Sequence, residues 1–428
     1  MSYEDSVNPL NPRIKSFIFE DPEHSTFRVH RSAMTLPSVY EAEVERIFGR
    51  CWLYLGHESE VSRPGDFKTR WVGGRPLIFV RDDDGIVRAF LNSCPHRGAE
   101  VCREDAGKTK HFTCFYHGLT FTNKGKLASI SGPDSYGPSF DKSALNLHEV
   151  RLQAYRGFVF VTFDRDNVDL VTYLADAKDY IDVISDVGWN GLEVISGTHK
   201  YSMRANWKML PENSLDGLHA FTTHSTWITY LKDTGVNVSG GLKGFSRDLG
   251  NGHSVIDYHG VNGRPVALWE PLWGEDARSD IEESRNRLIE MYGEERALWI
   301  AERNKNLLIF PNLIFIDAMS LTVRTCWPVS HDYMIVTAWA LGVVGELPEH
   351  RERRLESFLT FLGPGSFATP DDVEALDVCQ RGLSTYRELE WSDMSRGMGK
   401  SVQAVDDEEP GRTYWRRWNE LMTTPQEA

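Results

Sequence analysis

Cys94-Pro95-His96-Arg97-Gly98 is followed, after fifteen residues, by Cys114-Phe115-Tyr116-His117-Gly118. Each stretch comes after a strand-like run and pairs a thiolate with an imidazole, the ligand types that hold zinc or iron in proteins. The glycine after each histidine permits a tight turn of the backbone around a bound group. These residues predict a metal centre in a domain built of short strands.

The spacing of the ligands distinguishes two kinds of metal centre. A structural zinc site usually has about two to four residues between its paired ligands, whereas Cys94 and His96 have one residue between them. In a two-iron cluster, the thiolates can bind one iron and the imidazoles the other, and such imidazole ligation raises the cluster potential. The short spacing therefore favours a two-iron cluster, with structural zinc as the alternative.

The chain around these ligands, residues 42–163, reads as β structure. Short apolar runs such as Pro76–Val80 and Gly157–Phe163 are separated by turn signals such as Pro64-Gly65. Regular spacing of this kind predicts a small antiparallel barrel or sandwich.

Further along the chain, helical and strand patterns are mixed without strict alternation, which favours an α+β domain. Eight glycines between Gly235 and Gly263 indicate a mobile loop or a loosely paired hairpin. We expect helices at Asp280–Asn304, Glu349–Phe361 and Asp371–Leu389, and strands at Leu307–Ile316, Leu321–Trp327 and Met334–Leu341.

Composition narrows the class of protein. The 428 residues correspond to two or three domains, and a net charge of −15 argues against nucleic acid as a partner. No apolar stretch reaches the roughly 20 residues of a membrane span, and the first thirty residues do not resemble a secretory signal. Six cysteines in a chain of this length do not form a disulfide framework. We expect a cytoplasmic protein with reduced thiols.

A second group of candidate ligands lies downstream, in the segment Asn206–His224. Asp216 and His219 are three residues apart and share one face if the segment is helical. His219 and His224 are five residues apart, which places them about 140° apart on a regular helix. If both histidines bind one metal ion, the helix must be distorted or must end between them.

A third, acidic ligand lies later in the chain, and spacing does not choose among Asp371, Asp372 and Glu374. The same residues also resemble a helix start, with Thr369 as the cap, Pro370 in the first position and Asp372 where a capping box places its acid. From the residues alone, Asp372 is therefore as consistent with helix capping as with metal binding.

The two Cys-x-His and Cys-x-x-His pairs resemble the Rieske [2Fe–2S] motif of ring-hydroxylating oxygenases, and the Asp–His–His segment resembles the mononuclear-iron motif of the same family. The resemblance covers residues from about 43 to 422. It implies an all-β Rieske domain at 42–165 and a larger α+β catalytic domain at 166–428, with an antiparallel sheet and helices in a helix-grip (START-like) arrangement. Residues 1–41 are implied to form an N-terminal segment that packs with the catalytic domain.

The resemblance also implies the roles of individual residues. The cluster ligands are Cys94, His96, Cys114 and His117. The mononuclear iron ligands are His219, His224 and Asp372, the last because it lies between Gly363-Pro364 and Gln380-Arg381-Gly382 as in the family pattern. Asp216 is implied to connect His219 to a Rieske histidine of a neighbouring subunit, supported by Glu212 and Asn213.

The implied activity is that of the oxygenase component of a multicomponent dioxygenase. Electrons from NADH pass through a reductase, with or without a ferredoxin, to the [2Fe–2S] cluster and then to Fe(II) in an adjacent subunit, where O2 is added to an aromatic ring. The chain shows no GxGxxG fingerprint of its own. A homotrimer, or an α3β3 assembly with a small β subunit, is implied. The alternatives are a Rieske monooxygenase, which hydroxylates one carbon or removes an alkyl group, and a non-catalytic zinc-binding protein.

The candidate substrate-binding residues are a few apolar side chains and two arginines. Leu218, Phe221 and Trp227 lie near the iron segment and suit a flat ring, although each is equally plausible as a core residue. Arg324 and Arg412 are candidates to bind a substrate carboxylate bidentately, the alternative being that each pairs with a protein carboxylate. The resemblance is to relatives that act on benzoate-like acids such as p-cumate, salicylate or terephthalate, and we expect the Gly-rich stretch to cover the entrance of the pocket.

Overall fold

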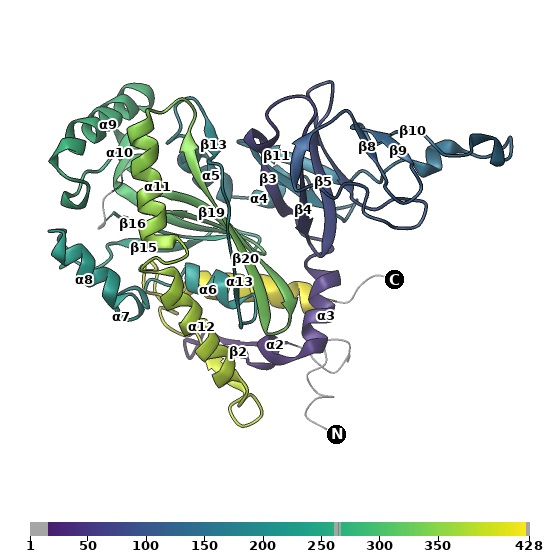
Figure 1. Cartoon of the computed structure of the whole chain (residues 1–428). Coiled ribbons are helices and arrows are strands. Elements are labelled where there is room, and N and C mark those ends of the chain that lie inside the picture. The colour runs from purple at the N-terminus through teal and green to yellow at the C-terminus, as the bar shows by residue number, and fades with distance from the viewer. Residues whose placement is uncertain (1–15, 261–263, 265–266, 425–428) are drawn as a thin grey trace. The chain divides into compact units, whose positions relative to one another are not determined.

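The structure, a computed structural model, describes residues 16–260, 264 and 267–424. The chain divides into two compact units, Phe48–Leu170 and a larger unit made of Met1–Ile47 with Val171–Ala428. The smaller unit contains the two Cys–His motifs, and the larger contains the Asp–His–His segment (Figure 1). Within the described ranges, no helix combines the length and the apolar character needed to cross a membrane.

The smaller unit is built of short antiparallel strands, as the alternation of apolar runs and turns predicts. Its sheets have the strand orders β6-β5-β4-β7, β11-β12-β3 and β10-β9-β8. The strands are β3 (Leu53–His57), β4 (Asp66–Val72), β5 (Arg75–Arg81), β6 (Val87–Leu91), β7 (Ala106–Lys108), β8 (His111–Thr113), β9 (Thr120–Thr122), β10 (Leu127–Ser129), β11 (Arg151–Tyr155) and β12 (Phe158–Thr162).

The two Cys–His turns of this unit share one backbone hydrogen-bonding pattern. The N–H of Cys94 donates to Ala99 O at 2.8 Å, and the N–H of Gly98 donates back to Cys94 O at 2.8 Å. The second turn repeats this pattern, with Cys114 bonded to Leu119 and to Gly118. Gly98 and Gly118 adopt φ values of +76° and +72°, a region that glycine enters without steric cost. The expected tight turns are present at both positions.

The larger unit is organised around one antiparallel sheet with helices packed on it. The strand order is β13-β20-β19-β18-β17-β16-β15, and β14 also pairs with β20. Its strands are β13 (Leu192–Val194), β14 (His199–Met203), β15 (Gly244–Asp248), β16 (Ser254–His259), β17 (Arg303–Ile309), β18 (Leu313–Asp317), β19 (Leu321–Ser330) and β20 (Tyr333–Val343). A separate small sheet combines β1 (Ile18–Asp21), β2 (Thr26–His30) and β21 (Trp391–Asp393).

Helices from several parts of the chain pack on the main sheet of the larger unit. α11 packs on β19 and β20, and α13 packs on β15 and β16 (Figure 1). α6 packs on β18, and α5 and α10 pack on β17. The helices are α2 (Ser32–Thr35), α3 (Pro37–Arg46), α4 (Leu170–Leu174), α5 (Ala177–Ser185), α6 (Met209–Ser214), α7 (Ala220–Thr223), α8 (Ser225–Asp233), α9 (Arg278–Tyr292), α10 (Glu294–Glu302), α11 (Pro348–Leu362), α12 (Thr369–Leu383) and α13 (Glu409–Thr423).

The α+β class is confirmed, but three predicted elements are corrected. The helix expected at Asp280–Asn304 is two helices, because Gly293 at φ +78° separates α9 from α10. The strand expected at Leu307–Ile316 is the hairpin β17–β18, whose two strands are joined by Phe310–Asn312. The Gly-rich stretch contains a well-paired hairpin, β15–β16, of which β16 is almost entirely buried in the main sheet.

A buried ion pair connects helix α3 to the start of helix α6. Glu43, in α3, is fully buried and accepts hydrogen bonds from Lys208 Nζ at 2.5 Å and from the indole N–H groups of Trp207 and Trp418 at 2.8 Å each. Lys208 is also fully buried, and burial lowers its pKa while the Glu43 carboxylate opposes that change. Because α6 begins directly after Lys208, the pair fixes the start of the helix that carries Glu212 and Asn213.

Replacing Glu43 should destabilise the larger unit strongly. In Glu43→Gln, Lys208 becomes a buried charge without a carboxylate, a change that typically costs about 3–5 kcal/mol. We expect the apparent melting temperature to fall by on the order of 10 °C, measured by differential scanning calorimetry. Glu45→Gln on the same helix is the control, because Glu45 is exposed, and it should change stability by less than about 0.5 kcal/mol. Equal melting temperatures for the two variants would contradict the assignment.

Candidate functional site

The segment that carries the two histidines is a broken helix. α7 ends at Thr223 and α8 begins at Ser225, and His224 between them has φ −95° and ψ 42°, outside helical geometry. His219 directly precedes α7. The helix therefore ends between the two histidines, which is the condition that their five-residue spacing set for binding one metal ion.

Three side chains converge at this break. One ligand atom each from His219, His224 and Asp372 lies within 4.8 Å of the other two, the only such group of three among the residues the structure describes. Asp372 Oδ1 is 3.4 Å from His224 Nε2 and 3.7 Å from His219 Nε2. His224 and Asp372 are buried, and His219 is largely buried. The arrangement brings two imidazole nitrogens and one carboxylate oxygen to the same small volume.

Each imidazole is oriented by a second carboxylate. His219 Nδ1 is 3.2 Å from Asp216 Oδ2, and His224 Nδ1 is 3.4 Å from Asp371 Oδ2. A carboxylate on Nδ1 favours the tautomer that carries its proton there, which leaves the Nε2 lone pair free to bind a metal. Sequence reasoning considered Asp371 only as a rival to Asp372 for the third ligand, whereas the structure places it behind His224.

Asn213, at the end of α6, completes the group. Its amide Nδ2 donates to Asp372 Oδ1 at 3.1 Å and lies 3.4 Å from His219 Nε2.

Asp216 and His219 change each other's pKa. Burial raises the pKa of Asp216, but the hydrogen bond and the charge of His219 outweigh burial and lower that pKa overall. Burial likewise lowers the pKa of His219, and Asp216 and Asp372 more than reverse that effect. The second carboxylate therefore strengthens the basicity of the imidazole that it orients.

The start of α12 differs from the predicted capping box. Thr369 is the first helical residue, and its hydroxyl donates to Leu362 O at 3.1 Å instead of capping the helix. The side chain of Asp372 makes no cap hydrogen bond and instead faces the histidines. Glu374 lies on the surface, 3.7 Å from Arg381. Of the three candidate carboxylates, Asp372 is the one that meets both imidazoles.

The donor set fits a mononuclear ferrous ion. Two imidazoles and one carboxylate on one side of a metal form the facial triad of non-haem iron oxygenases, which leaves other coordination positions open. The carboxylates behind the two histidines are the outer partners that such ligands usually have. His219, His224 and Asp372 would hold the ion.

In the smaller unit, the four Cys and His residues lie at the tips of two neighbouring turns. The rings of His96 and His117 are 4.5 Å apart between centroids, and the thiols of Cys94 and Cys114 are buried in the apolar core of the unit. Burial raises the pKa of the Cys94 thiol, an effect that a coordinating metal ion would reverse. Buried thiolates and an exposed His96 would hold a [2Fe–2S] cluster with its histidine side toward solvent.

A cavity of about 110 Å³ opens beside the histidines of the larger unit. It is of the size that holds a single aromatic ring, since an apolar cavity of about 150 Å³ binds benzene in another protein. Arg324 on β19 and Asn306 on β17 form part of one wall. Both bond to Ser214, through Arg324 Nη2 to Ser214 Oγ at 2.6 Å and Asn306 Nδ2 to Ser214 O at 3.0 Å. The apolar lining includes Phe221, Trp227, Ile228, Ile316, Phe361 and Val405.

The other sequence-predicted substrate residues divide into two groups. Phe221, Trp227 and Arg324 line the cavity, whereas Leu218 is 47% exposed and lies outside its lining. Arg412 also lies away from the cavity, fully buried and bonded to Glu409 and to backbone carbonyls. Its guanidinium already has protein partners, so the structure does not support the expected contact with a substrate anion. Sequence reasoning missed Asn306 and Val405, which no local pattern distinguishes from ordinary strand and loop residues.

Comparison with known proteins identifies the family. A model described as the Rieske [2Fe-2S] domain matches residues 51–149, and one described as the ring hydroxylating alpha subunit (catalytic domain) matches residues 192–424. The chain belongs to the Rieske ring-hydroxylating dioxygenases, as an α subunit. The matched ranges contain all the ligand residues described above.

Individual relatives agree with this family assignment. The large subunit of anthranilate 1,2-dioxygenase from Acinetobacter baylyi is 35% identical, over 88% of this chain and 81% of the relative. Toluate 1,2-dioxygenase subunit alpha from Pseudomonas putida is 32% identical, over 92% and 87%. A structure of naphthalene 1,2-dioxygenase with indole bound superposes with a TM-score of 0.82 at 25% identity, over 93% of this chain and 92% of that chain. As a family member, the chain is an oxidoreductase with a Rieske [2Fe–2S] cluster and a mononuclear non-haem iron.

The ligand assignment predicts separate loss of the two metal centres. His224→Ala removes one donor of the facial triad and should release the mononuclear iron, lowering the iron content by about one atom per chain. The visible spectrum of the cluster should be unchanged, because its four ligands lie in the other compact unit. Both quantities are measured on anaerobically purified protein by elemental analysis and absorption. His259→Ala, at an exposed position on β16, is the control, and iron content equal to that control would refute the role of His224.

Proposed function

We propose that this chain is the large subunit of a dioxygenase that binds an aromatic carboxylate in the cavity beside His219, His224 and Asp372. Both atoms of O2 are added to the ring, giving a cis-dihydrodiol. The observation that carries this proposal is a buried guanidinium, that of Arg324, in the wall of a mostly apolar cavity.

Within the part of the chain that the structure describes, Arg324 has no carboxylate partner. Its side chain is 4% exposed, its Nε atom is buried without a hydrogen-bond partner, and no carboxylate among the described residues lies within 4.0 Å of it. A buried cation without a counter-charge is energetically unfavourable by several kcal/mol. A substrate carboxylate in the cavity would supply the missing charge, and the planar guanidinium suits it geometrically.

The names of the relatives support the same substrate class. Anthranilate and toluate are both aromatic carboxylates, and the enzymes named for them are among the proteins most similar to this chain. Because neither name describes this chain, the inference depends on Arg324 and not on similarity alone.

The residues around the metal have distinct tasks in this proposal. An iron bound by His219, His224 and Asp372 would supply the centre at which O2 is activated. Asp216 and Asp371 hold the two imidazoles, and Asn213 holds Asp372 by a hydrogen bond. The apolar walls exclude water from the reacting ring. Burial raises the pKa of Glu212, which precedes Asn213 in α6 and accepts a hydrogen bond from the Trp415 indole, to about 7, so this carboxyl can hold a proton at neutral pH.

Electrons reach an enzyme of this kind from NADH through a separate reductase, with or without a ferredoxin. We further propose that they cross between subunits through Asp216, in a homotrimer or an α3β3 assembly with a small β subunit. One carboxylate oxygen of Asp216 faces His219, while 41% of the side chain stays exposed. That exposed edge is available to a Rieske histidine of another copy. A cytoplasmic location stays a prediction from the composition.

Asp216→Asn should separate metal binding from electron transfer. The amide keeps the shape of the side chain, so both metals should be retained, but it orients His219 less well and carries no charge. Loss of such an outer partner typically costs about 10- to 100-fold in activity. We expect oxidation of the pre-reduced cluster by O2 in the presence of substrate to slow by at least that factor in single-turnover stopped-flow absorption. Wild-type rates in the variant would refute the bridging role.

The substrate class is tested by turnover of benzoate and substituted benzoates with a surrogate reductase, NADH and ¹⁸O2. Arg324→Met should lower kcat/KM for the acids by on the order of 100-fold, because hydrogen bonds to charged groups contribute about 1.5–3 kcal/mol. Benzamide, which lacks the charge, should lose much less, and Arg324→Lys should recover part of the activity on acids. Activity is measured by product mass.

Two results would contradict the proposal. Equal loss of activity on acids and on benzamide in Arg324→Met would show that the guanidinium does not recognise the carboxylate. Incorporation of one labelled oxygen atom into the product, instead of two, would show monooxygenation in place of dioxygenation.

A further inference from the structure

The C-terminal segment Ser395–Asp407, between β21 and α13, forms part of the cavity wall through one residue. Val405 is 2% exposed and lines the cavity together with Gly217. The two residues approach so closely that a Cβ atom at position 217 would lie 2.5 Å from Val405 O and 2.7 Å from Val405 Cγ1. Only glycine permits this approach, and Gly217 lies between Asp216 and His219 in the chain.

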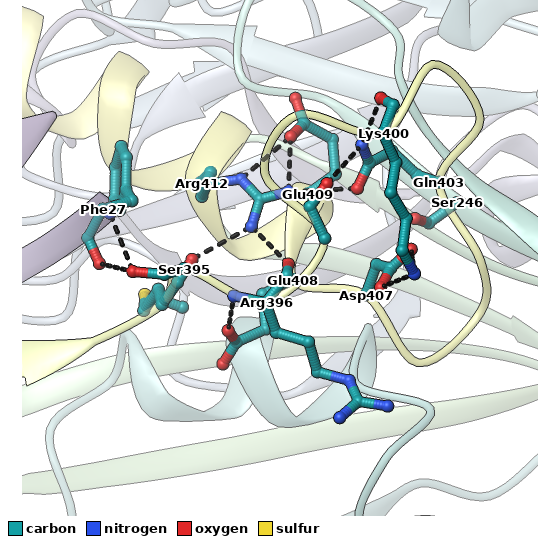
Figure 2. Close-up of polar contacts among 12 residues, drawn as sticks. Phe27, Ser246, Ser395, Arg396, Lys400, Gln403, Asp407, Glu408, Glu409 and Arg412 are labelled. Carbon is teal, nitrogen blue, oxygen red and sulfur yellow. Dashed lines mark hydrogen bonds and ion pairs between the residues drawn. The ribbon is translucent and has the colours of Figure 1, made fainter. Parts of the chain in front are cut away.

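The position of this segment is fixed by the first turn of α13. Arg412 is fully buried and donates to Arg396 O at 2.6 Å, Met394 O at 3.0 Å and Gln403 Oε1 at 3.1 Å (Figure 2). It also pairs with Glu409 at 2.8 Å. One guanidinium therefore joins the start of the segment and Gln403, two residues before Val405, to the helix that follows.

Further contacts hold the segment from its other sides. Asp407 is buried and accepts hydrogen bonds from Lys400 Nζ at 2.6 Å and from Ala404 N–H at 2.7 Å (Figure 2). The N–H of Ser246 on β15 donates to Gln403 O at 3.1 Å, and its hydroxyl donates to Ala404 O at 3.0 Å. The residue immediately before Val405 is thus bonded to the edge of the main sheet, so Val405 has little freedom to move away from Gly217.

We propose that Val405 limits the size of the ring substituent that the cavity accepts, and that Arg412 is a positioning residue that holds Val405 in the wall. The proposal rests on the proposed function, because it needs an aromatic ring in this cavity. Its physical basis is the small cavity volume of about 110 Å³. In so small a cavity, the two methyl groups of Val405 occupy space that a ring substituent of similar size would need. Removal of these methyl groups should admit a larger substituent.

The test compares small and large substrates in two series, benzoate with 4-isopropylbenzoate and benzene with isopropylbenzene. In Val405→Ala, the ratio of kcat/KM for the large over the small member should rise on the order of 10-fold, since one methylene in an apolar pocket discriminates by about 10- to 200-fold. Val402→Ala is the matched control, because Val402 lies in the same segment but is 74% exposed and outside the cavity lining. It should leave the ratio unchanged.

Arg412 is tested through the same ratio. Arg412→Gln should shift the ratio in the direction of Val405→Ala and alter the regioisomers of the product, while iron content and cluster spectrum stay at wild-type values. Arg412→Lys should restore part of the wild-type ratio. A residue with a general structural role would lower kcat for small and large substrates alike, so an unchanged ratio in a folded, iron-loaded Arg412→Gln protein overturns its positioning role.

The two proposals fail in different ways. If the enzyme converts benzene and isopropylbenzene but neither of the two acids, the aromatic-acid proposal is overturned. The ratio of kcat/KM for isopropylbenzene over benzene then still supports or refutes the role of Val405. An unchanged size ratio in Val405→Ala, with either series, overturns the inference about Val405.

Discussion

The convergence of two imidazole nitrogens on one carboxylate oxygen is the constraint on which the larger unit depends. His219 and His224 belong to one short segment, but Asp372 comes from a helix about 150 residues later. Bringing three hydrophilic groups into a buried volume is unfavourable unless each has a partner. Asp216, Asp371 and Asn213 supply those partners, and a metal ion would complete them. The arrangement explains why carboxylates gather at this point in a largely apolar interior.

The break between α7 and α8 is part of the same constraint. A regular helix would direct His219 and His224 to different sides, and Asp372 could then meet only one of them. Ending the first helix at Thr223 costs hydrogen bonds, and packing of the second helix compensates for them, because Trp227 and Leu231 are buried against Met319 and Val236. Stability of the apolar cluster therefore maintains the geometry of the polar site.

The buried charges of this chain have different partners, and the differences indicate function. Lys208 pairs with Glu43, and Arg264 pairs with Asp317 at 2.6 Å, so both cations are neutralised within the protein. Arg412 is satisfied by Glu409 and by carbonyl groups, which makes it a structural cross-link. Arg324 has a serine hydroxyl and no anion in the described chain. The contrast supports the proposed role of Arg324 in binding the substrate, whereas Arg412 belongs to the scaffold.

The sequence by itself determined the ligand types, their order along the chain, the β-rich first unit and the α+β second unit. These features are local. A glycine after each histidine predicts a tight turn, and an apolar run between turn residues predicts a strand, without knowledge of the rest of the fold. The five-residue spacing also predicted that, if both histidines bind one metal ion, the helix is distorted or ends between them. Resemblance to the family singled out Asp372, where spacing left Asp371 and Glu374 as equal candidates.

Only the tertiary structure decided what surrounds the ligands. Asn306 and Arg324 share a cavity wall because Asn306 pairs with Ile316 on β18, and Ile316 pairs with Thr322, two residues before Arg324 on β19. Strand register of this kind is set by packing over the whole sheet and leaves no local pattern. From the sequence alone, Arg324 and Arg412 were equal candidates to bind a substrate carboxylate. Their partners come from distant parts of the chain, and those partners alone distinguish a substrate contact from a scaffold contact.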